Sequence, residues 1–309
     1  MPGRPLSRAH ARAACSTGLV TEATTAQVQV LRGRLVPLGG IRAMYVRRTL
    51  PHRSRAFIGA WCFVDHYGPN EIGADAGNTG GIFPFTGGSR LIQNGEVSER
   101  ETADLARALL LLLVPGGLLL AVKAGGGVIG LGLAGLLLVW AYSAPPLKLM
   151  SRGLGELAVA LAWFLVVVGA DYVQRRQLFI IPASVALNFA ALVAALLLIN
   201  GVPDAPADAR VGKRTLAVRL GPTRTAALYT ALTLGAHAWL AVSVGLLVPP
   251  QKALWGLVSL PLSLFASAWL WRQRQRPERL RPALAATVAA TLLHGLAMAA
   301  GFAWLGLRH

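Results

Sequence analysis

Long apolar blocks, separated by short polar breaks, occupy the chain from about residue 104 to residue 307. A helix that crosses a bilayer needs about 20 mainly apolar residues. Seven blocks approach this length, although the second is short and its border with the first is weakly marked. The pattern therefore predicts an all-α polytopic membrane protein, with spanning helices at about 104–122, 126–142, 154–173, 178–199, 225–248, 253–271 and 283–306.

The first 80 residues differ from the rest, because they are polar, Arg-rich and contain no long apolar run. Two stretches, RAMYVRRTL (42–50) and AFIGAWCFV (56–64), have the alternation and the β-branched or aromatic content of strands. Two or three strands alone are marginally stable. We therefore expect a short β-rich segment, soluble or partly disordered, over residues 1–78 and a helical membrane domain over residues 79–309.

Basic residues are distributed unevenly among the polar breaks. The breaks at 143–153, 200–224 and 272–282 hold twelve Lys and Arg residues, whereas the other breaks and the C-terminal end hold five. The positive-inside rule places the richer side in the cytoplasm. The sequence thus predicts a multi-pass protein of the plasma (inner) membrane whose N-terminus is cytoplasmic.

The composition also favours lipid as the surrounding solvent. Hydrophobic residues make up 54% of the chain and charged residues only 14%, whereas soluble proteins carry about a quarter charged residues. The net charge of +17 is then explained by loop charge and attraction to the membrane surface. A nucleic-acid-binding protein would cluster its basic residues on a polar domain, so nucleic acid is not an expected partner. Cys15 and Cys62 have no metal-ligand spacing.

Carboxylates interrupt the apolar pattern in LLINGVPDAPADARVGKRTLAVRLG, residues 197–221. Asn200, Asp204 and Asp208 are spaced four residues apart, so they would share one face if the preceding helix continues. Oxygen ligands of this kind suit Mg²⁺, which binds through one or two carboxylates together with substrate phosphates.

The same stretch contains two prolines and a basic pair. Pro203 and Pro206 predict that the helix ends or is distorted here. Lys213 and Arg214 follow, and such cations can hold diphosphate oxygens. Carboxylates, a divalent metal and cations would together form a site for a diphosphate leaving group. On spacing alone, a solvated loop whose charges only fix topology is equally compatible with the pattern.

A second polar break, YSAPPLKLMSRGLGE (142–156), falls on the same predicted side of the membrane. Tyr142 ends an apolar block, two prolines force a turn, and Lys148 and Arg152 follow. Tyr142 also fits an interfacial aromatic anchor, and the two basic residues also fit topogenic charges.

These two breaks together resemble the loops of UbiA-type membrane prenyltransferases, in particular the branch that acts on 1,4-dihydroxy-2-naphthoate in menaquinone biosynthesis. NGVPDAPADARVGKRTLAVRLG resembles the second Asp-rich motif of that family and its tail, and YSAPPLKLMSRGLGEL resembles another of its loops. FPFTGGSRLIQNGEVSERE (83–101) resembles the segment after the first Asp-rich motif. The resemblance covers about residues 79–309.

The resemblance implies a helix bundle around a lateral cavity that is open to lipid. In such a cavity Mg²⁺ would bind the diphosphate of a polyprenyl diphosphate, and ionisation would give an allylic cation that an aromatic acceptor attacks. The sequence does not indicate an oligomeric state. The resemblance implies metal ligands at Asn200, Asp204 and Asp208, catalytic roles for Asp204, Asp208 and Lys213, and substrate-binding roles for Tyr142, Lys148, Arg152, Arg214 and Arg90.

The chain departs from the first N-D-x-x-D motif of the family. NEIGADAGNTGG (70–81) has Ala74 and Asn78 where a repeat at every fourth residue would need Asp. The preceding FIGAWCFVDHY is too short and too polar to span a bilayer. The first metal half-site and the first two helices are therefore expected to be missing. One alternative is therefore a catalytically inactive composite membrane protein. A separate alternative is a family member with another aromatic acceptor.

The N-terminal segment has a resemblance of its own. VPLGGIRAMYVRRTLPHRSRAFIGAWCFVDHYGP (36–69) resembles the start of pirin-like proteins, which implies a double-cupin fold with a histidine and glutamate iron site over about residues 30–69. No histidine follows His66 before His237, and His52 and His66 do not make a ligand set. A membrane-tethered iron-binding protein is therefore the least favoured alternative.

Two histidines lie inside the apolar blocks. Polar residues at membrane depth often have a function. The sequence shows no partner for His237 or His294, so we interpret both as packing or lipid-interface residues.

Overall fold

The computed structural model describes residues 78, 80–82, 84–86 and 99–307. These residues form an all-α structure, as predicted. The two stretches predicted to be strands, the N-terminal histidines and cysteines, and Arg90 lie outside them. The α-helices are α6 (Glu99–Ala124), α7 (Gly127–Ser143), α8 (Gly155–Arg175), α9 (Ile180–Arg210), α10 (Leu216–Gly245), α11 (Leu260–Gln273) and α12 (Arg281–Gly306), and the 3₁₀ helices are η1 (Leu149–Arg152), η2 (Gln251–Ser259) and η3 (Pro277–Arg279).

The predicted apolar blocks correspond to these helices one by one. Within the described part of the chain, six helical stretches are long and apolar enough to cross a membrane, with η2 and α11 forming one of them. The second block, which is short in the sequence, becomes the 17-residue helix α7. The protein is therefore an integral membrane protein with several spanning helices.

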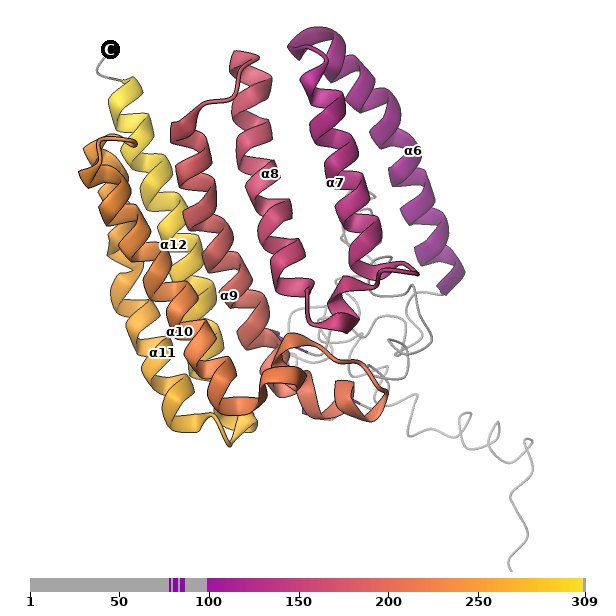
Figure 1. Cartoon of the computed structure of the whole chain (residues 1–309), viewed down its shortest axis with the longest axis vertical. Helices are drawn as coiled ribbons and strands as arrows, with labels where there is room; N and C mark the ends of the chain where they lie inside the picture. The colour runs from indigo at the N-terminus through magenta and orange to yellow at the C-terminus, as the bar shows by residue number, and fades with distance from the viewer. Residues whose placement is uncertain (1–77, 79, 83, 87–98, 308–309) are drawn as a thin grey trace, which may run out of the picture. The chain divides into compact units, whose positions relative to one another are not determined.

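The helices stand side by side, and α9 lies among them (Figure 1). It packs against α8, α10 and α12, whereas α6 contacts mainly α7 and α8. The η1 turn, the end of α9 and the start of α10 all lie at the same end of the bundle (Figure 1). The two polar breaks singled out in the sequence therefore share one end of the protein.

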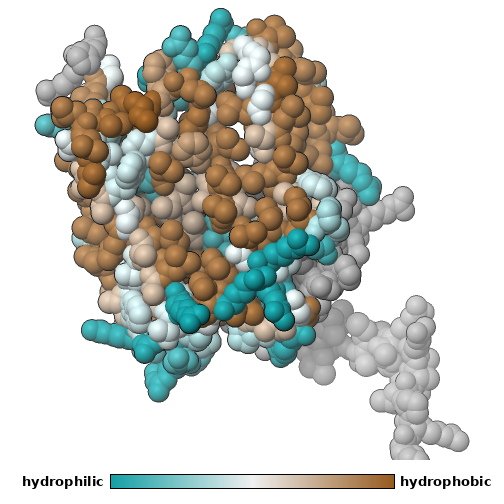
Figure 2. All heavy atoms as spheres, in the orientation of Figure 1, coloured by the Kyte–Doolittle hydropathy of each residue, from teal (hydrophilic) through white to brown (hydrophobic). Residues whose placement is uncertain are grey.

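Apolar side chains cover much of the outer surface. Figure 2 shows hydrophobic residues over the middle of the bundle and hydrophilic ones mainly at its ends. Leu111 and Val122 of α6 are 73% and 86% exposed. Lipid tails are as apolar as these side chains, so this exposure is stable in a bilayer, where only the backbone polar groups must be satisfied within the helices.

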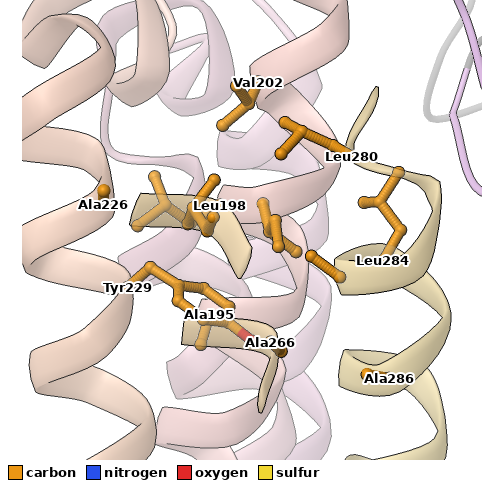
Figure 3. Close-up of a cluster of buried hydrophobic side chains, with 12 residues drawn as sticks. Ala195, Leu198, Val202, Ala226, Tyr229, Ala266, Leu280, Leu284 and Ala286 are labelled. Carbon is orange, nitrogen blue, oxygen red and sulfur yellow. The ribbon is translucent and has the colours of Figure 1, made fainter. Parts of the chain in front are cut away.

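The interior is built from alanines and a few larger residues. Figure 3 shows a cluster that joins α9, α10, α11 and α12, with Leu198 and Tyr229 among its members. Small residues let helices approach closely and gain packing contacts that lipid cannot replace. The Tyr229 hydroxyl also forms a 2.6 Å hydrogen bond with the Thr287 hydroxyl, which satisfies both groups at a buried position.

The sequence predicts that Pro203 and Pro206 end or distort the helix. The prediction that the helix ends here is wrong, because α9 continues through both prolines to Arg210. Each proline removes one backbone donor and costs about 3 kcal/mol in a helix interior. Ile199, Val202 and Pro203 are buried where α9 meets its neighbours. This packing holds the last two turns in helical form despite the lost hydrogen bonds.

Two other predicted helices differ in their details. The block at 225–248 is preceded by a short helical stretch from Leu216, and the chain kinks at Gly221, where φ is 71°. The block at 253–271 begins as the 3₁₀ helix η2. A Cβ atom at Gly256 would lie 2.8 Å from the Met298 side chain. Because glycine has no Cβ atom, η2 can lie close against α12 at this position.

Candidate functional site

The end of α9 carries the row of oxygen-bearing side chains that the sequence predicts. Because the helix is continuous to Arg210, Asn200, Asp204 and Asp208 lie on successive turns of one face. Asp208 is buried, and the Asn200 Oδ1 atom is buried without a hydrogen-bond partner. A buried carbonyl oxygen without a donor is costly, and a cation is one ligand that would satisfy it.

The turn that ends α9 brings Lys213 back to this row. Gly212 has a φ of 77°, the left-handed conformation that glycine adopts without strain. The Lys213 N–H donates to the Asp208 carbonyl oxygen over 3.0 Å, and the Gly212 N–H donates to the Ala209 carbonyl oxygen over 3.2 Å. These bonds form a Schellman motif. As a result the Lys213 ammonium lies 3.5 Å from the Asp208 carboxylate.

The two polar breaks are joined through their backbones. The Arg214 N–H donates to the Ser151 carbonyl oxygen over 3.0 Å, and the Arg219 Nε donates to the Arg214 carbonyl oxygen over 3.1 Å. A Cβ atom on Gly153 would lie 2.7 Å from the Arg219 side chain. The η1 loop therefore rests directly on the segment that connects α9 and α10.

A hollow of about 580 Å³ opens beside this junction. Three basic residues, Lys213, Arg214 and Arg219, contribute to its lining. The sequence predicts a catalytic role for Lys213 and a substrate-binding role for Arg214, but it assigns no role to Arg219. Arg219 belongs to the same basic cluster, residues 210–219, and this was the sequence signal that could have identified it. A hollow lined by basic residues suits phosphate oxygens.

The remaining predicted residues of the η1 loop have different surroundings. The Arg152 guanidinium donates to the Pro146 carbonyl oxygen over 2.7 Å and thus closes its own loop. Lys148 adopts a left-handed conformation with a φ of 42° just before η1. The Tyr142 ring lies near Gly155, where a Cβ atom would approach it to 3.5 Å. The roles of Tyr142, Lys148 and Arg152 in substrate binding stay predictions.

An amide from outside the helices reaches Asp204. The Asn78 Nδ2 atom donates to the Asp204 Oδ1 atom over 2.7 Å. Asn78 belongs to the stretch that departs from the first metal motif of the family, because Asn stands there where the motif would need Asp. The sequence signal that could have identified Asn78 was a polar side chain just before residues 83–101, the segment that resembles the family.

The donor set fits a hard cation. Among the described residues there is no group of three or more His, Cys, Asp and Glu side chains that could hold a metal. Mg²⁺ needs only one or two carboxylates, because it keeps its waters and shares substrate phosphates. The two aspartates, the buried Asn200 oxygen and the nearby cationic hollow meet that description.

His237 and His294 are packing residues inside the bundle, and the structure adds polar partners that the sequence does not show. Both are buried, and both approach the Ser259 hydroxyl, at 2.8 Å and 3.1 Å respectively. His294 also contacts the Asn188 amide oxygen. The partners come from η2 and α9, which are far away in sequence, so the local pattern held no signal for them.

Comparison with known proteins decides the family. The sequence profile described as the UbiA prenyltransferase family matches residues 59–290. The chain belongs to the UbiA prenyltransferase family. This assignment confirms the resemblance of the two polar breaks, and it identifies the chain as a member of a family of prenyl-group transferases.

The curated relatives of this UbiA-family chain are consistent with that assignment. The 1,4-dihydroxy-2-naphthoate octaprenyltransferase of Mycobacterium tuberculosis is 33% identical over 216 residues, which cover 70% of this chain and 73% of the relative. The enzyme of the same name from Haemophilus influenzae is 27% identical over 250 residues, which cover 77% and 78% of the two chains. No solved structure matches this UbiA-family chain.

A short match of another kind agrees with the pirin-like resemblance. A candidate quercetin 2,3-dioxygenase of Pseudomonas aeruginosa is 40% identical over 60 residues, which cover 19% of this UbiA-family chain and 18% of the relative. The division of the chain into a segment 1–78 and a domain 79–309 stays a prediction, as does the loss of the first two family helices.

Proposed function

We propose that this chain transfers a polyprenyl group from a polyprenyl diphosphate to an aromatic acceptor in a Mg²⁺-dependent reaction. The observation that carries the proposal is the row Asn200, Asp204 and Asp208 on one face of α9, with the Lys213 ammonium 3.5 Å from Asp208. A row of oxygen ligands next to cations is what a diphosphate and its metal require.

In this proposal, Asp204, Asp208 and the Asn200 amide oxygen hold Mg²⁺. When bound, Mg²⁺ would neutralise part of the charge that develops on the departing diphosphate. Lys213, together with the other basic residues of the hollow, provides fixed positive charge for the phosphate oxygens that Mg²⁺ does not reach.

The reaction breaks the bond between the allylic carbon and the diphosphate oxygen, and the electron pair leaves with the diphosphate. A ring carbon of the acceptor then bonds to the allylic cation. The ring regains aromaticity by losing a proton, or carbon dioxide where the attacked carbon carries a carboxylate. The protein's part is to hold the diphosphate at the end of α9 while the polyprenyl chain lies among apolar side chains.

The acceptor proposed here is 1,4-dihydroxy-2-naphthoate, in menaquinone biosynthesis. This proposal rests on the relatives from Mycobacterium tuberculosis and Haemophilus influenzae, which are named as octaprenyltransferases of that compound. The excess of basic residues at the site end favours a cytoplasmic position for the site in the plasma membrane. A different aromatic acceptor and an inactive composite protein are the alternatives that the experiment distinguishes.

The test is prenyl transfer in isolated membranes that contain the full chain. Labelled polyprenyl diphosphate and 1,4-dihydroxy-2-naphthoate are supplied with Mg²⁺ or with a chelator, and hydroxybenzoate serves as the second acceptor. Product is expected with Mg²⁺ only, and it should disappear in Asp204→Asn. Asp171→Asn is the matched control, because Asp171 pairs with Arg175 on α8 at 3.0 Å, far along that helix from the η1 loop.

Each outcome separates the alternatives. Product with hydroxybenzoate alone would support the family reaction with another acceptor. No product with either acceptor, in membranes where insertion of the chain is shown, would overturn the proposal in favour of an inactive protein.

A further inference from the structure

We propose that Asn78 is a positioning residue for Asp204, whose amide holds the carboxylate in the orientation that a divalent cation requires. The inference rests on the proposed function, because it concerns the same metal site. It assigns a part in that site to a segment in which the sequence shows no family-like metal motif.

The geometry fixes the direction of the amide. The Asn78 Oδ1 atom accepts a hydrogen bond from the Gly80 N–H over 3.1 Å, and the Nδ2 atom donates to Asp204 over 2.7 Å. A flipped amide would place its NH₂ group against a backbone donor and its oxygen against a carboxylate, which loses both bonds. Asn78 is only 6% exposed, so water competes weakly for this contact.

The segment that carries Asn78 is anchored to the helix bundle. The Ile82 N–H donates to the Thr86 hydroxyl over 2.7 Å, and the Phe85 N–H donates to the Ile82 carbonyl oxygen over 2.8 Å. The side chains of Ile82 and Phe85 pack against the buried cluster of α9 to α12. A Cβ atom on Gly80 would lie 3.4 Å from the Pro203 carbonyl oxygen, so the segment lies close to α9 itself.

An amide donates to Asp204, whereas an ammonium approaches Asp208 one turn away on α9. Asp208 is approached by the Lys213 ammonium, which carries a positive charge. The Asn78 amide is neutral, so its hydrogen bond orients the Asp204 carboxylate without itself adding a positive charge. Carboxylates that bind metals are commonly held by such outer hydrogen bonds, and loss of the outer partner costs about 10- to 100-fold in metal affinity.

The experiment measures metal binding directly, without turnover. The full chain is reconstituted in lipid nanodiscs with inorganic diphosphate, and Mn²⁺ is titrated while the electron paramagnetic resonance signal of free Mn²⁺ is followed. Asn78→Ala is expected to raise the Mn²⁺ dissociation constant about 10- to 100-fold. Asn78→Gln, which keeps the NH₂ donor on a longer side chain, is expected to recover part of that loss.

Thr86→Ala is the matched control. It removes the hydroxyl that accepts from the Ile82 N–H in the same segment and leaves the Asn78 amide in place, so it is expected to lower thermal stability and to change the Mn²⁺ dissociation constant less than Asn78→Ala does. An equal weakening in the two variants would overturn the inference, because the segment as a whole, and not the amide, would then be responsible.

Failure of the inference and failure of the proposed function give different results. If the unsubstituted chain binds Mn²⁺ in a way that Asp204→Asn abolishes, but Asn78→Ala binds equally well, the positioning role alone is overturned. If the unsubstituted chain binds no more Mn²⁺ than Asp204→Asn, the metal site of the proposed function is overturned as well.

Discussion

The Lys213 ammonium lies 3.5 Å from a carboxylate oxygen of Asp208, and both side chains are mostly shielded from solvent. The Schellman motif at Gly212 produces this contact, since it folds the chain back over the last turn of α9. The backbone that ends the helix therefore also sets the distance between the carboxylate and the cation. Lys213 lines the basic hollow too, so the same ammonium can interact with a phosphate group placed there.

Removing the charge of Lys213 should weaken diphosphate binding. A hydrogen bond to a charged group contributes about 1.5–3 kcal/mol, so Lys213→Gln is expected to raise the KM for polyprenyl diphosphate about 10- to 100-fold. Lys213→Arg keeps the charge and should lose less. Steady-state kinetics in membranes would measure both, with Lys252→Gln on η2 as the control. An unchanged KM in Lys213→Gln would contradict a role in substrate binding.

Two glycines offer a matched test of the contact between the loops. Gly153 and Gly212 both have a left-handed backbone, with φ values of 73° and 77°. An added Cβ atom would lie 2.7 Å from Arg219 at Gly153 but would meet nothing within 4 Å at Gly212. Both alanine variants carry similar backbone strain, but only Gly153→Ala should also displace the Arg219 side chain.

Prenyl transfer activity and thermal stability of both variants would be measured. Gly153→Ala is expected to lose activity because it displaces Arg219, whereas a loss in Gly212→Ala would reflect the Schellman turn that places Lys213. Unchanged activity in Gly153→Ala would show that close contact between the Gly153 loop and Arg219 is not needed for the reaction.

The buried contact between Asn188 and His294 should stabilise the bundle. The Asn188 amide also donates to the Ala236 carbonyl oxygen over 2.5 Å, so these groups join α9, α10 and α12. Interhelical hydrogen bonds in membranes average about 0.6 kcal/mol and reach about 1.7 kcal/mol. A double-mutant cycle with Asn188→Leu and His294→Leu, unfolded with SDS in mixed micelles, is expected to give a coupling energy in that range. A coupling energy of zero would leave the contact without a stabilising role.

Close packing of η2 against α12 makes a further prediction. A Cβ atom on Gly301 would lie 2.4 Å from the Lys252 carbonyl oxygen, whereas one on Gly306 would meet nothing within 4 Å. Gly301→Ala should destabilise the protein by about 1–3 kcal/mol, because backbone must move to admit the methyl group. Gly306→Ala on the same helix is the control, and similar stability of the two variants in SDS titrations would contradict the tight contact.

The sequence predicted the parts of the molecule that depend on local pattern. Spanning helices need length and hydropathy, and both are visible along the chain, so the seven blocks were found. The shared face of Asn200, Asp204 and Asp208 was also predictable, because it depends only on helical spacing. The prolines misled the prediction of where α9 ends, since the packing that outweighs their cost comes from other helices.

The remaining parts depend on residues that are distant in sequence. Asn78 reaches Asp204 across 126 positions, and His294 reaches Asn188 across 106. A motif is defined by particular residue types at fixed spacing. Asn78 is an amide at a position where the motif needs a carboxylate, so it does not match. Hydrogen-bond partners of this kind become visible only when the helices have been placed side by side.

The share of buried residues differs between the helices, so the helices differ in how strongly the bundle holds them. In the apolar windows of α6 and α9, 6% and 56% of the residues are buried. A helix with few interior contacts resists little force. If the protein were extracted from a bilayer by pulling at its N-terminal side, we expect α6 to leave early, while α9 and its neighbours hold until late. The Asp204 end of α9 would therefore keep its shape through the early stages of mechanical unfolding.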